Sequence, residues 1–219
     1  MMKKIILLVV FVVFGTTTLK AQDKVQDRDR DRVMLVDGDV LQIRDRDQIR
    51  LKDNIILNDG TVVYPDGSYQ TKDQVRLRLR DGECLDNDGV LFRNEYQYRY
   101  KIQQENKGLA EAQVQQRNQN RYQIMVIDGD AYQIRNQFQN QIREQIKLEN
   151  GTVVNPDGSY QTRDRVQLRL KDGECLNMNG EMFKNTLQHR KMMINKPMMQ
   201  NKVQNKSLIK KQTKKKGAA

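Results

Sequence analysis

A gapless internal duplication constrains this sequence more than any other feature. Residues 34–92 align with residues 125–183 at an offset of 91 positions, and 33 of the 59 aligned pairs are identical. The densest match joins Gly60–Thr71 to Gly151–Thr162, which both read Gly-Thr-Val-Val-x-Pro-Asp-Gly-Ser-Tyr-Gln-Thr. A repeat of this length predicts two homologous structural units.

Turn dipeptides divide each copy at regular intervals. In the first copy Asp-Gly occurs at positions 37, 59 and 81 and again at 66 and 88, so both series have a spacing of 22 residues. The second copy retains every glycine and replaces Asp by Asn at positions 150 and 179. Asn and Asp both tolerate the left-handed conformation of tight hairpin turns, and Gly adopts it freely. The pattern therefore predicts short chain reversals and argues against metal-binding loops.

The residues around these dipeptides favour strands. Val75–Arg80 alternates apolar and charged residues, which is typical of a half-buried strand. Tyr64–Gly67 predicts a type I turn, in which Pro presets the backbone and Gly takes the left-handed place. Two-residue hairpins at position 81 and at its equivalent, position 172, predict two cross-strand pairs each. The pairs are Leu79 with Cys84, Arg80 with Glu83, Leu170 with Cys175, and Lys171 with Glu174.

These signals predict a mainly β fold. We expect two tandem homologous antiparallel β-hairpin meander domains of four to six short strands each, joined by a polar linker that is either helical or flexible. The alternation is weaker over residues 39–58. The expected boundaries are a signal peptide at 1–21, a charged and solvated leader at 22–32, β domains at 33–92 and 124–183, the linker at 93–123, and a disordered basic Met/Lys-rich tail at 184–219.

The size of the copies indicates that they are not independent. A 60-residue domain buries only about 60% of the surface that its unfolded chain exposes, and it is marginally stable alone. The chain also has no Trp. We therefore expect the two copies to pack together or to extend one sheet.

The N-terminus predicts export. Met1–Lys4 carries two lysines, ten apolar residues follow at 5–14, and a short polar stretch ends at Ala21. A membrane span needs about 20 apolar residues, so this segment is too short to remain as an anchor. We expect cleavage after Ala21 and a periplasmic or extracellular location in a bacterium. The alternative is a buried apolar helix of the mature fold.

The net charge of +11 is concentrated at the C-terminus. Residues 33–92 carry a net charge of −4 and residues 124–183 a net charge of −2, whereas residues 184–219 hold 11 basic side chains and no acidic one. This distribution argues against a sequence-specific nucleic-acid groove on the domains. The end of the tail could bind envelope polyanions, or it could serve only as a solubilising segment; its lysines are Lys210, Lys211, Lys214, Lys215 and Lys216.

Two motifs in fixed order resemble a known type of domain. Gly-Thr-Val-Val-x-Pro-Asp-Gly-Ser is followed by Asp-Gly-Glu-Cys-Leu at 81–85 and again at 172–176. This combination resembles a small uncharacterised domain of secreted proteins in Gram-negative bacteria, often present in tandem. The resemblance covers both 59-residue copies and implies a fold and export, with no activity attached to it.

Cys84 and Cys175 occupy equivalent places in the two copies. In an exported chain they could form a disulfide that joins the copies, because disulfides persist outside the cytosol. The alternative is that each thiol is a small buried apolar group. No His or cationic cluster lies nearby in the sequence to lower a thiol pKa, so we do not expect a catalytic cysteine.

A second candidate site combines thioethers with the single histidine of the chain. Soft thioethers together with imidazole select Cu(I). The alternative is a flexible Met-containing tail, because the many neighbouring lysines would repel a cation. The candidate ligands are His189, Met192, Met193, Met198 and Met199.

No other pattern indicates catalysis or a cofactor. Asp86–Gly89 starts like a calcium loop, but the second copy reads Asn-Met-Asn-Gly there and the twelfth position holds Gln97 instead of Glu. There is no Gly-rich phosphate loop and no nucleophile with a base at a recognisable spacing. The sequence predicts a non-enzymatic exported interaction or structural module without a cofactor. The alternative is a periplasmic copper-handling protein that uses the tail.

Overall fold

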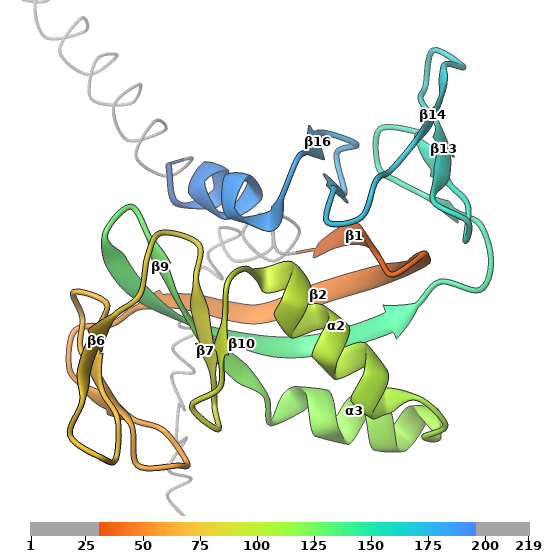
Figure 1. The fold of residues 1–219 in the computed structure, drawn as a ribbon. Helices are drawn as coiled ribbons and strands as arrows, with labels where there is room; N and C mark the ends of the chain where they lie inside the picture. The colour runs from red at the N-terminus through yellow and green to blue at the C-terminus, as the bar shows by residue number, and fades with distance from the viewer. Residues whose placement is uncertain (1–30, 196–219) are drawn as a thin grey trace, which may run out of the picture.

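The computed structural model describes residues 31–195. Figure 1 shows long central strands, with helices on one side and small hairpin sheets at two ends. The first copy forms β1 (Asp31–Val36), β2 (Asp39–Arg50), β3 (Ile55–Ile56), β4 (Val62–Val63), β5 (Ser68–Gln70), β6 (Arg76–Arg78), β7 (Cys84–Asp86) and β8 (Leu91–Phe92).

Two helices follow and the second copy then repeats the strand pattern. The linker forms α2 (Glu95–Asn106) and α3 (Glu111–Gln119), so the helical version of the linker is confirmed. The second copy forms β9 (Tyr122–Ile127), β10 (Asp130–Gln141), β11 (Ile146–Lys147), β12 (Val153–Val154), β13 (Ser159–Gln161), β14 (Gln167–Arg169), β15 (Cys175–Asn177) and β16 (Met182–Phe183). Residues 186–195 are helical.

The two copies exchange strands within one sheet. The strand order is β16-β15-β1-β2-β10-β9-β7-β8. The β15–β16 pair of the second copy therefore adds to β1, and the β7–β8 pair of the first copy adds to β9. The mainly β fold of two tandem meanders is confirmed, and the copies extend one sheet. Each copy also forms a four-stranded sheet of its own, β3-β4-β5-β6 or β11-β12-β13-β14.

A pseudo-twofold axis passes between β2 and β10. These strands pair antiparallel, and Asp45 lies opposite Asn136, the residue that corresponds to Asp45 in the second copy at the offset of 91. The pairs on either side are related in the same way, since Arg44 faces Phe138 and Asp47 faces Arg135. The ladder shifts its register around Asn136, as expected where a bulge re-aims side chains.

One face of the long sheet is covered by the two small sheets. Because side chains alternate along a strand, β1 presents Val33 and Leu35 to this face, where they meet β12, β13 and β15 of the second copy. The matching cluster joins Ile124 and Val126 of β9 to strands of the first copy. Each apolar cluster therefore contains residues from both copies.

The opposite face packs against α2 and the helix at 186–195. Tyr98 and Ile102 of α2 lie with Cys84 and Phe92, while Cys175 packs with residues of β1 and β2. The two helices begin alike: Asn94 accepts a hydrogen bond from the Gln97 N–H, and the equivalent Asn185 accepts one from the Gln188 N–H, both at 3.0 Å. The structural repeat is thus longer than 59 residues. No helix within residues 31–195 is long and apolar enough to cross a membrane.

The turn predictions are confirmed where the backbone can be compared. Asp37-Gly38 and Asp128-Gly129 have positive φ at both residues, as a type I′ turn requires. At Tyr64–Gly67 the Gly67 N–H donates to the Tyr64 carbonyl at 3.0 Å, and Gly67 has a φ of +81°. The predicted type I turn with a left-handed glycine is therefore present.

The predicted hairpin at Asp81 is wrong. The strand before it, β6, pairs with β5, and the strand after it, β7, pairs with β8 and β9. The turn is still formed, since the Glu83 N–H donates to the Arg80 carbonyl at 3.0 Å, but it directs the chain from the small sheet into the long one. The four predicted facing pairs do not form a ladder; they are Leu79 with Cys84, Arg80 with Glu83, Leu170 with Cys175, and Lys171 with Glu174.

Two segments expected to be solvated contribute to the core. The leader was expected to extend through residue 32, yet β1 starts at Asp31 and Arg32 is fully buried. The tail was expected to start at 184, yet residues 186–195 are helical and His189 and Arg190 are fully buried. The core accommodates Arg32 and Arg190 because both arginines pair with Asp45 and Glu95. The remaining parts of the predicted signal peptide, leader and tail lie outside the described residues.

The strand exchange predicts that neither half of the chain folds alone. We expect fragments 22–108 and 109–219, cut at the turn after α2, each to lack cooperative unfolding as a monomer, because both clusters on the small-sheet face need residues of both copies. An equimolar mixture is expected to restore the circular dichroism spectrum of the intact chain. A folded monomeric fragment in size-exclusion chromatography and thermal unfolding would contradict the exchanged topology.

Candidate functional site

The most unusual feature of the interior is a cluster of five charged side chains at the pseudo-twofold axis. We call it the buried ion network: Arg32 of β1, Asp45 of β2, Glu95 and Arg99 of α2, and Arg190 of the C-terminal helix. Each of the five is at most 1% exposed. Alternation along β1 and β2 points Arg32 and Asp45 to the helix face, where the first turns of both helices lie above them.

Both carboxylates are shared by three guanidinium groups. Asp45 accepts from Arg32 at 2.6 Å, from Arg99 at 2.8 Å and from Arg190 at 3.0 Å. Oε1 of Glu95 accepts from the same three arginines at 2.5, 2.8 and 2.6 Å, and Oε2 accepts a further bond from Arg190 Nε at 2.7 Å. The planar guanidinium group is suited to this, because it donates several bonds in fixed directions.

The arginines keep both acids ionised. Burial by itself raises the pKa of Asp45, but the attraction of Arg32, Arg190 and Arg99 outweighs it and lowers the pKa to about 2. Burial likewise opposes the ionised form of Glu95, and the same arginines hold its pKa well below the ordinary value. With three cations and two anions, the network carries one net positive charge in the interior.

The second copy supplies a largely uncharged counterpart of this network. At the offset of 91, Arg32 corresponds to Gln123, Asp45 to Asn136 and Glu95 to Thr186, while Arg99 corresponds to Arg190. Asn136 lies opposite Asp45 on the axis and accepts from Arg99 at 2.9 Å. Two carboxylates at this place would repel each other, and the amide removes that repulsion.

Sequence reasoning missed this network, although a signal for it exists. Asn94, Gln97 and Arg99 recur as Asn185, Gln188 and Arg190 at the same offset of 91. These three identities extend the duplication beyond residue 183 and predict a second helix. Without them, the positive charge of the segment favours a solvated tail.

His189 lies beside the network and is fully buried. Its ring packs edge-on against Phe183 with centroids 5.1 Å apart, and Tyr98 holds the equivalent place in α2. Burial lowers the pKa of His189 to about 3, and the neighbouring Arg32 and Arg190 add to this effect. The imidazole is therefore neutral at physiological pH.

The proposed copper ligands are not brought together by the described part of the chain. His189 faces the core, Met192 and Met193 are half-buried on the same helix, and Met198 and Met199 lie outside the described residues. Within residues 31–195 no group of three or more His, Cys, Asp or Glu side chains is placed to hold a metal ion. The five lysines expected to bind polyanions, Lys210, Lys211, Lys214, Lys215 and Lys216, also lie outside this range.

The two cysteines are free thiols in the structure, and both are buried. Cys84 on β7 and Cys175 on β15 are separated by four strands of the long sheet. Burial raises the pKa of Cys84 well above its usual range and that of Cys175 to about 12. The arrangement corresponds to the alternative reading, in which each thiol packs as a small apolar group.

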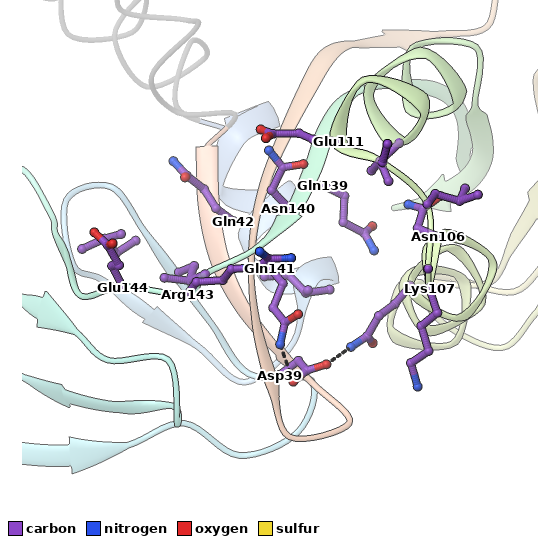
Figure 2. Close-up of a pocket in the computed structure, with 18 residues that line it drawn as sticks. Asp39, Gln42, Asn106, Lys107, Glu111, Gln139, Asn140, Gln141, Arg143 and Glu144 are labelled. Atoms are coloured by element: carbon purple, nitrogen blue, oxygen red, sulfur yellow. Dashed lines mark hydrogen bonds between the residues drawn. The ribbon is translucent and has the colours of Figure 1, made fainter.

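A groove of about 820 Å³ lies at the turn between α2 and α3, beside the ends of β2 and β10 (Figure 2). Asp39 lines the groove and accepts hydrogen bonds from Gln141 at 2.8 Å and from Gln103 at 2.5 Å. Carboxamides dominate the polar lining: Gln42, Gln103, Asn106, Gln139, Asn140 and Gln141. The groove could not be predicted from the sequence, because its lining is assembled from segments of both copies and of the linker.

The groove has the character of a binding surface. Its lining contains no His, Cys, Ser, Thr or Tyr, so it offers no hydroxyl or thiol nucleophile and no imidazole base. Carboxamides both donate and accept hydrogen bonds, so they suit a neutral polar ligand or a polypeptide backbone. The charged lining residues are two cations and three anions, which leaves a net charge of −1: Lys107, Arg143, Asp39, Glu111 and Glu144.

Comparison with known proteins identifies the repeated unit. Residues 30–91 and residues 122–182 each match the sequence model of the family described as "Domain of unknown function (DUF6799)". No match was found among curated proteins or among solved structures.

The buried ion network predicts unequal costs for two substitutions that each replace a charged side chain by Gln. Glu95→Gln leaves three arginines with one carboxylate, so we expect it to lower the free energy of unfolding by about 3–5 kcal/mol. Arg32→Gln places the second-copy residue in the first copy and leaves two arginines with two carboxylates. The Arg32→Gln variant is expected to lower the free energy of unfolding by clearly less than Glu95→Gln. Urea unfolding of both variants measures the difference, and equal costs would contradict the charge balance described above.

The buried imidazole predicts a loss of stability in mild acid. A neutral His189 binds no proton in the folded state above about pH 3, whereas the unfolded chain binds one below its ordinary pKa of 6.5. The neutral imidazole therefore contributes its full stabilisation of the folded state above pH 6.5. As the pH falls this contribution declines, and the free energy of unfolding is about 2 kcal/mol lower at pH 5. Urea unfolding at pH 7.5 and pH 5 measures it.

The matched control for that experiment is His189→Tyr, which introduces the residue found at the equivalent position of α2. This variant is expected to have nearly the same stability at both pH values, because it removes the single histidine of the chain. An unchanged pH dependence in the variant would show that His189 is not the group that titrates.

Proposed function

We propose, from the premise that this chain belongs to the DUF6799 family, that it is an exported, non-enzymatic interaction module held to anionic envelope surfaces by its C-terminal lysines. In this proposal the protein is cleaved after Ala21 and acts in the periplasm or outside a Gram-negative cell. The exchanged β scaffold presents binding surfaces, and the lysine-rich end attaches them.

The observation that carries this proposal is the placement of charge. Residues 31–195 contain 25 basic and 25 acidic side chains and are electrically neutral as a unit. Residues 22–30 are neutral as well, with three basic and three acidic side chains. All the net positive charge of a chain cleaved after Ala21 therefore comes from the eight lysines of residues 196–219.

The way the helix at 186–195 joins the body supports an attachment role. Arg190 is bonded to Asp45 and Glu95 in the buried ion network, and His189 lies in the core. The lysine-rich segment thus follows directly from a helix that is fixed to the scaffold. A polyanion bound by these lysines would hold the whole module close to the anionic surface.

The use of the ionisable groups in the body supports a role without catalysis. The charged groups with the largest pKa shifts form internal ion pairs in the buried ion network, and the thiols are covered. The amide-lined groove suits recognition of a neutral polar group, as described above. These features favour binding over chemical conversion of a ligand.

Retention on anionic vesicles tests the proposal. We would use vesicles containing lipopolysaccharide and compare the mature chain with a variant in which Lys210, Lys211, Lys214, Lys215 and Lys216 are changed to Gln. The mature chain is expected to sediment with the vesicles at low salt and to be released at high salt, because salt screens exposed charges. The Gln variant is expected to remain in solution under both conditions.

A variant with Arg at the same five positions is the control, since it keeps the charge and changes the side chain. It should sediment like the parent chain. Retention of the Gln variant, or retention of the parent that does not respond to salt, would contradict an electrostatic attachment through these lysines.

A further inference from the structure

The edge strands of the two small sheets expose apolar side chains in the same way. Residues 72–78 and 163–169 are exposed throughout. Val75 and Leu77 are 51% and 46% exposed, and their equivalents Val166 and Leu168 are 52% and 46% exposed. Leu79 and Leu170, the next residues with the same alternation, are buried in the two apolar clusters.

Duplication has retained these two exposed apolar residues and replaced most others. Of the seven large apolar residues exposed in the first copy and α2, only Val75 and Leu77 have identical equivalents. Leu91 is replaced by Met, whereas the other four are replaced by polar or charged residues; these are Ile49, Ile56, Val90 and Tyr100. Burial does not account for keeping Val75 and Leu77, so their retention points to a contact with another molecule.

The same two segments are basic although their domains are acidic. Residues 71–80 hold four basic side chains and one acidic one, and so do residues 162–171. Each edge therefore carries a net charge of +3, within domains whose net charges are −4 and −2. On β6 the arginines alternate with the apolar residues, so charge gathers on one face and Val75 and Leu77 lie on the other.

The free edge of each strand also offers backbone groups. The Leu79 N–H donates to the Gly67 carbonyl, and the Val75 carbonyl accepts from the Thr71 N–H, both at 3.0 Å. Antiparallel pairing alternates, so the N–H and C=O groups of Arg76 and Arg78 point away from β5. In the second copy the corresponding bonds at Leu170 and Val166 are 2.9 Å, which leaves Gln167 and Arg169 outward.

We propose that β6 and β14 each bind an extended polypeptide segment in which acidic and apolar residues alternate, added as a fifth strand to the small sheet. Its backbone would pair with the outward groups of the edge strand, its carboxylates would lie beside Arg76 and Arg78, and its apolar side chains would cover Val75 and Leu77. Neither strand includes any of the C-terminal lysines, so this binding would be additional to the attachment proposed above.

Charge argues against self-association as the use of this edge. Pairing β6 with β6 of another molecule would bring Arg76 and Arg78 beside arginines, and pairing it with β14 would bring one of them beside Arg169. Such contacts are unfavourable, and like charges on an edge are a common device against edge-to-edge aggregation. An acidic partner strand removes this repulsion. An acidic strand therefore satisfies the backbone, the charge and the apolar pattern together.

Fluorescence anisotropy with labelled peptides tests the proposal on the intact mature chain. The probe is a soluble seven-residue peptide in which Glu alternates with Val and Thr, and the control peptide has the same composition with its glutamates adjacent. At 0.15 M salt we expect the alternating peptide to bind about tenfold more tightly than the control. The control accounts for binding of any acidic peptide to the C-terminal lysines. Equal affinities would overturn the proposal.

A pair of edge variants separates strand addition from simple charge attraction. Arg78→Pro with Arg169→Pro removes one outward N–H from each edge, a substitution that edge strands tolerate, and Arg78→Ala with Arg169→Ala is the matched control. Both lose the same charges. We expect the Pro variant to bind the alternating peptide about fivefold more weakly than the Ala variant, with both folded by circular dichroism.

Binding of methylated peptides and of lipid vesicles identifies the class of partner. Methylating alternate amide nitrogens of the peptide is expected to abolish the preference for the alternating order, because these groups would pair with the edge. Identical binding of the Pro and Ala variants would overturn strand addition. So would binding of phosphatidylglycerol vesicles that depends on Val75 and Leu77 while the alternating peptide does not bind.

Discussion

The pairing of two buried carboxylates with three arginines at the pseudo-twofold axis is the constraint on which the rest of this structure depends. Asp45 and Glu95 receive hydrogen bonds from Arg32, Arg99 and Arg190, which come from the first strand, the linker helix and the C-terminal helix. Five charges in a dry interior are tolerated only when each is paired and correctly placed. Moving β2 against β10 by one residue would take Asp45 away from Asn136, which shares Arg99 with it. Shifting either helix along its axis would separate the arginines from the carboxylates. The network therefore fixes both the sheet register and the positions of the helices that cover it.

Strand exchange follows from the same arrangement. Each small sheet is a local meander, and its last turn, at Asp81 or Asp172, leads the chain into the shared long sheet, where it pairs with a strand of the other copy. Pairing β7 with β6 would satisfy the turn equally well, but it would leave β9 without its neighbour and Val126 and Leu85 without their shared cluster. The long-range packing decides between two folds that are locally equivalent.

Local signals predicted the parts of the fold that depend on local geometry. The positions of the turns and the type I turn at Pro65 could be inferred from glycine spacing and alternation, whereas the composition of the linker left both a helix and a flexible segment open. The partner of each strand could not, because the residues of β7 alternate in the same way whichever strand they meet. Arg32 and Arg190 were missed for another reason: both stand in highly charged segments, and composition alone cannot show that a charge is buried beside its counter-charge. The match of Arg99 with Arg190 at the repeat offset indicates that Arg190 lies on a second helix equivalent to α2.

The unequal halves of the network explain how a duplicated chain can function as one body. Two first copies joined by the same axis would place Asp45 opposite a second aspartate, with four carboxylates and four arginines in the interior. Two second copies would bury two residues equivalent to Arg190 with Asn136 and Thr186 and no carboxylate at all. Joining a copy that has two carboxylates to one that has none places a single acid on the axis, where both helices reach it. Divergence at the axis therefore makes the copies dependent on each other, whereas the two outer edges, which do not meet, have kept Val75, Leu77 and Arg78 as Val166, Leu168 and Arg169.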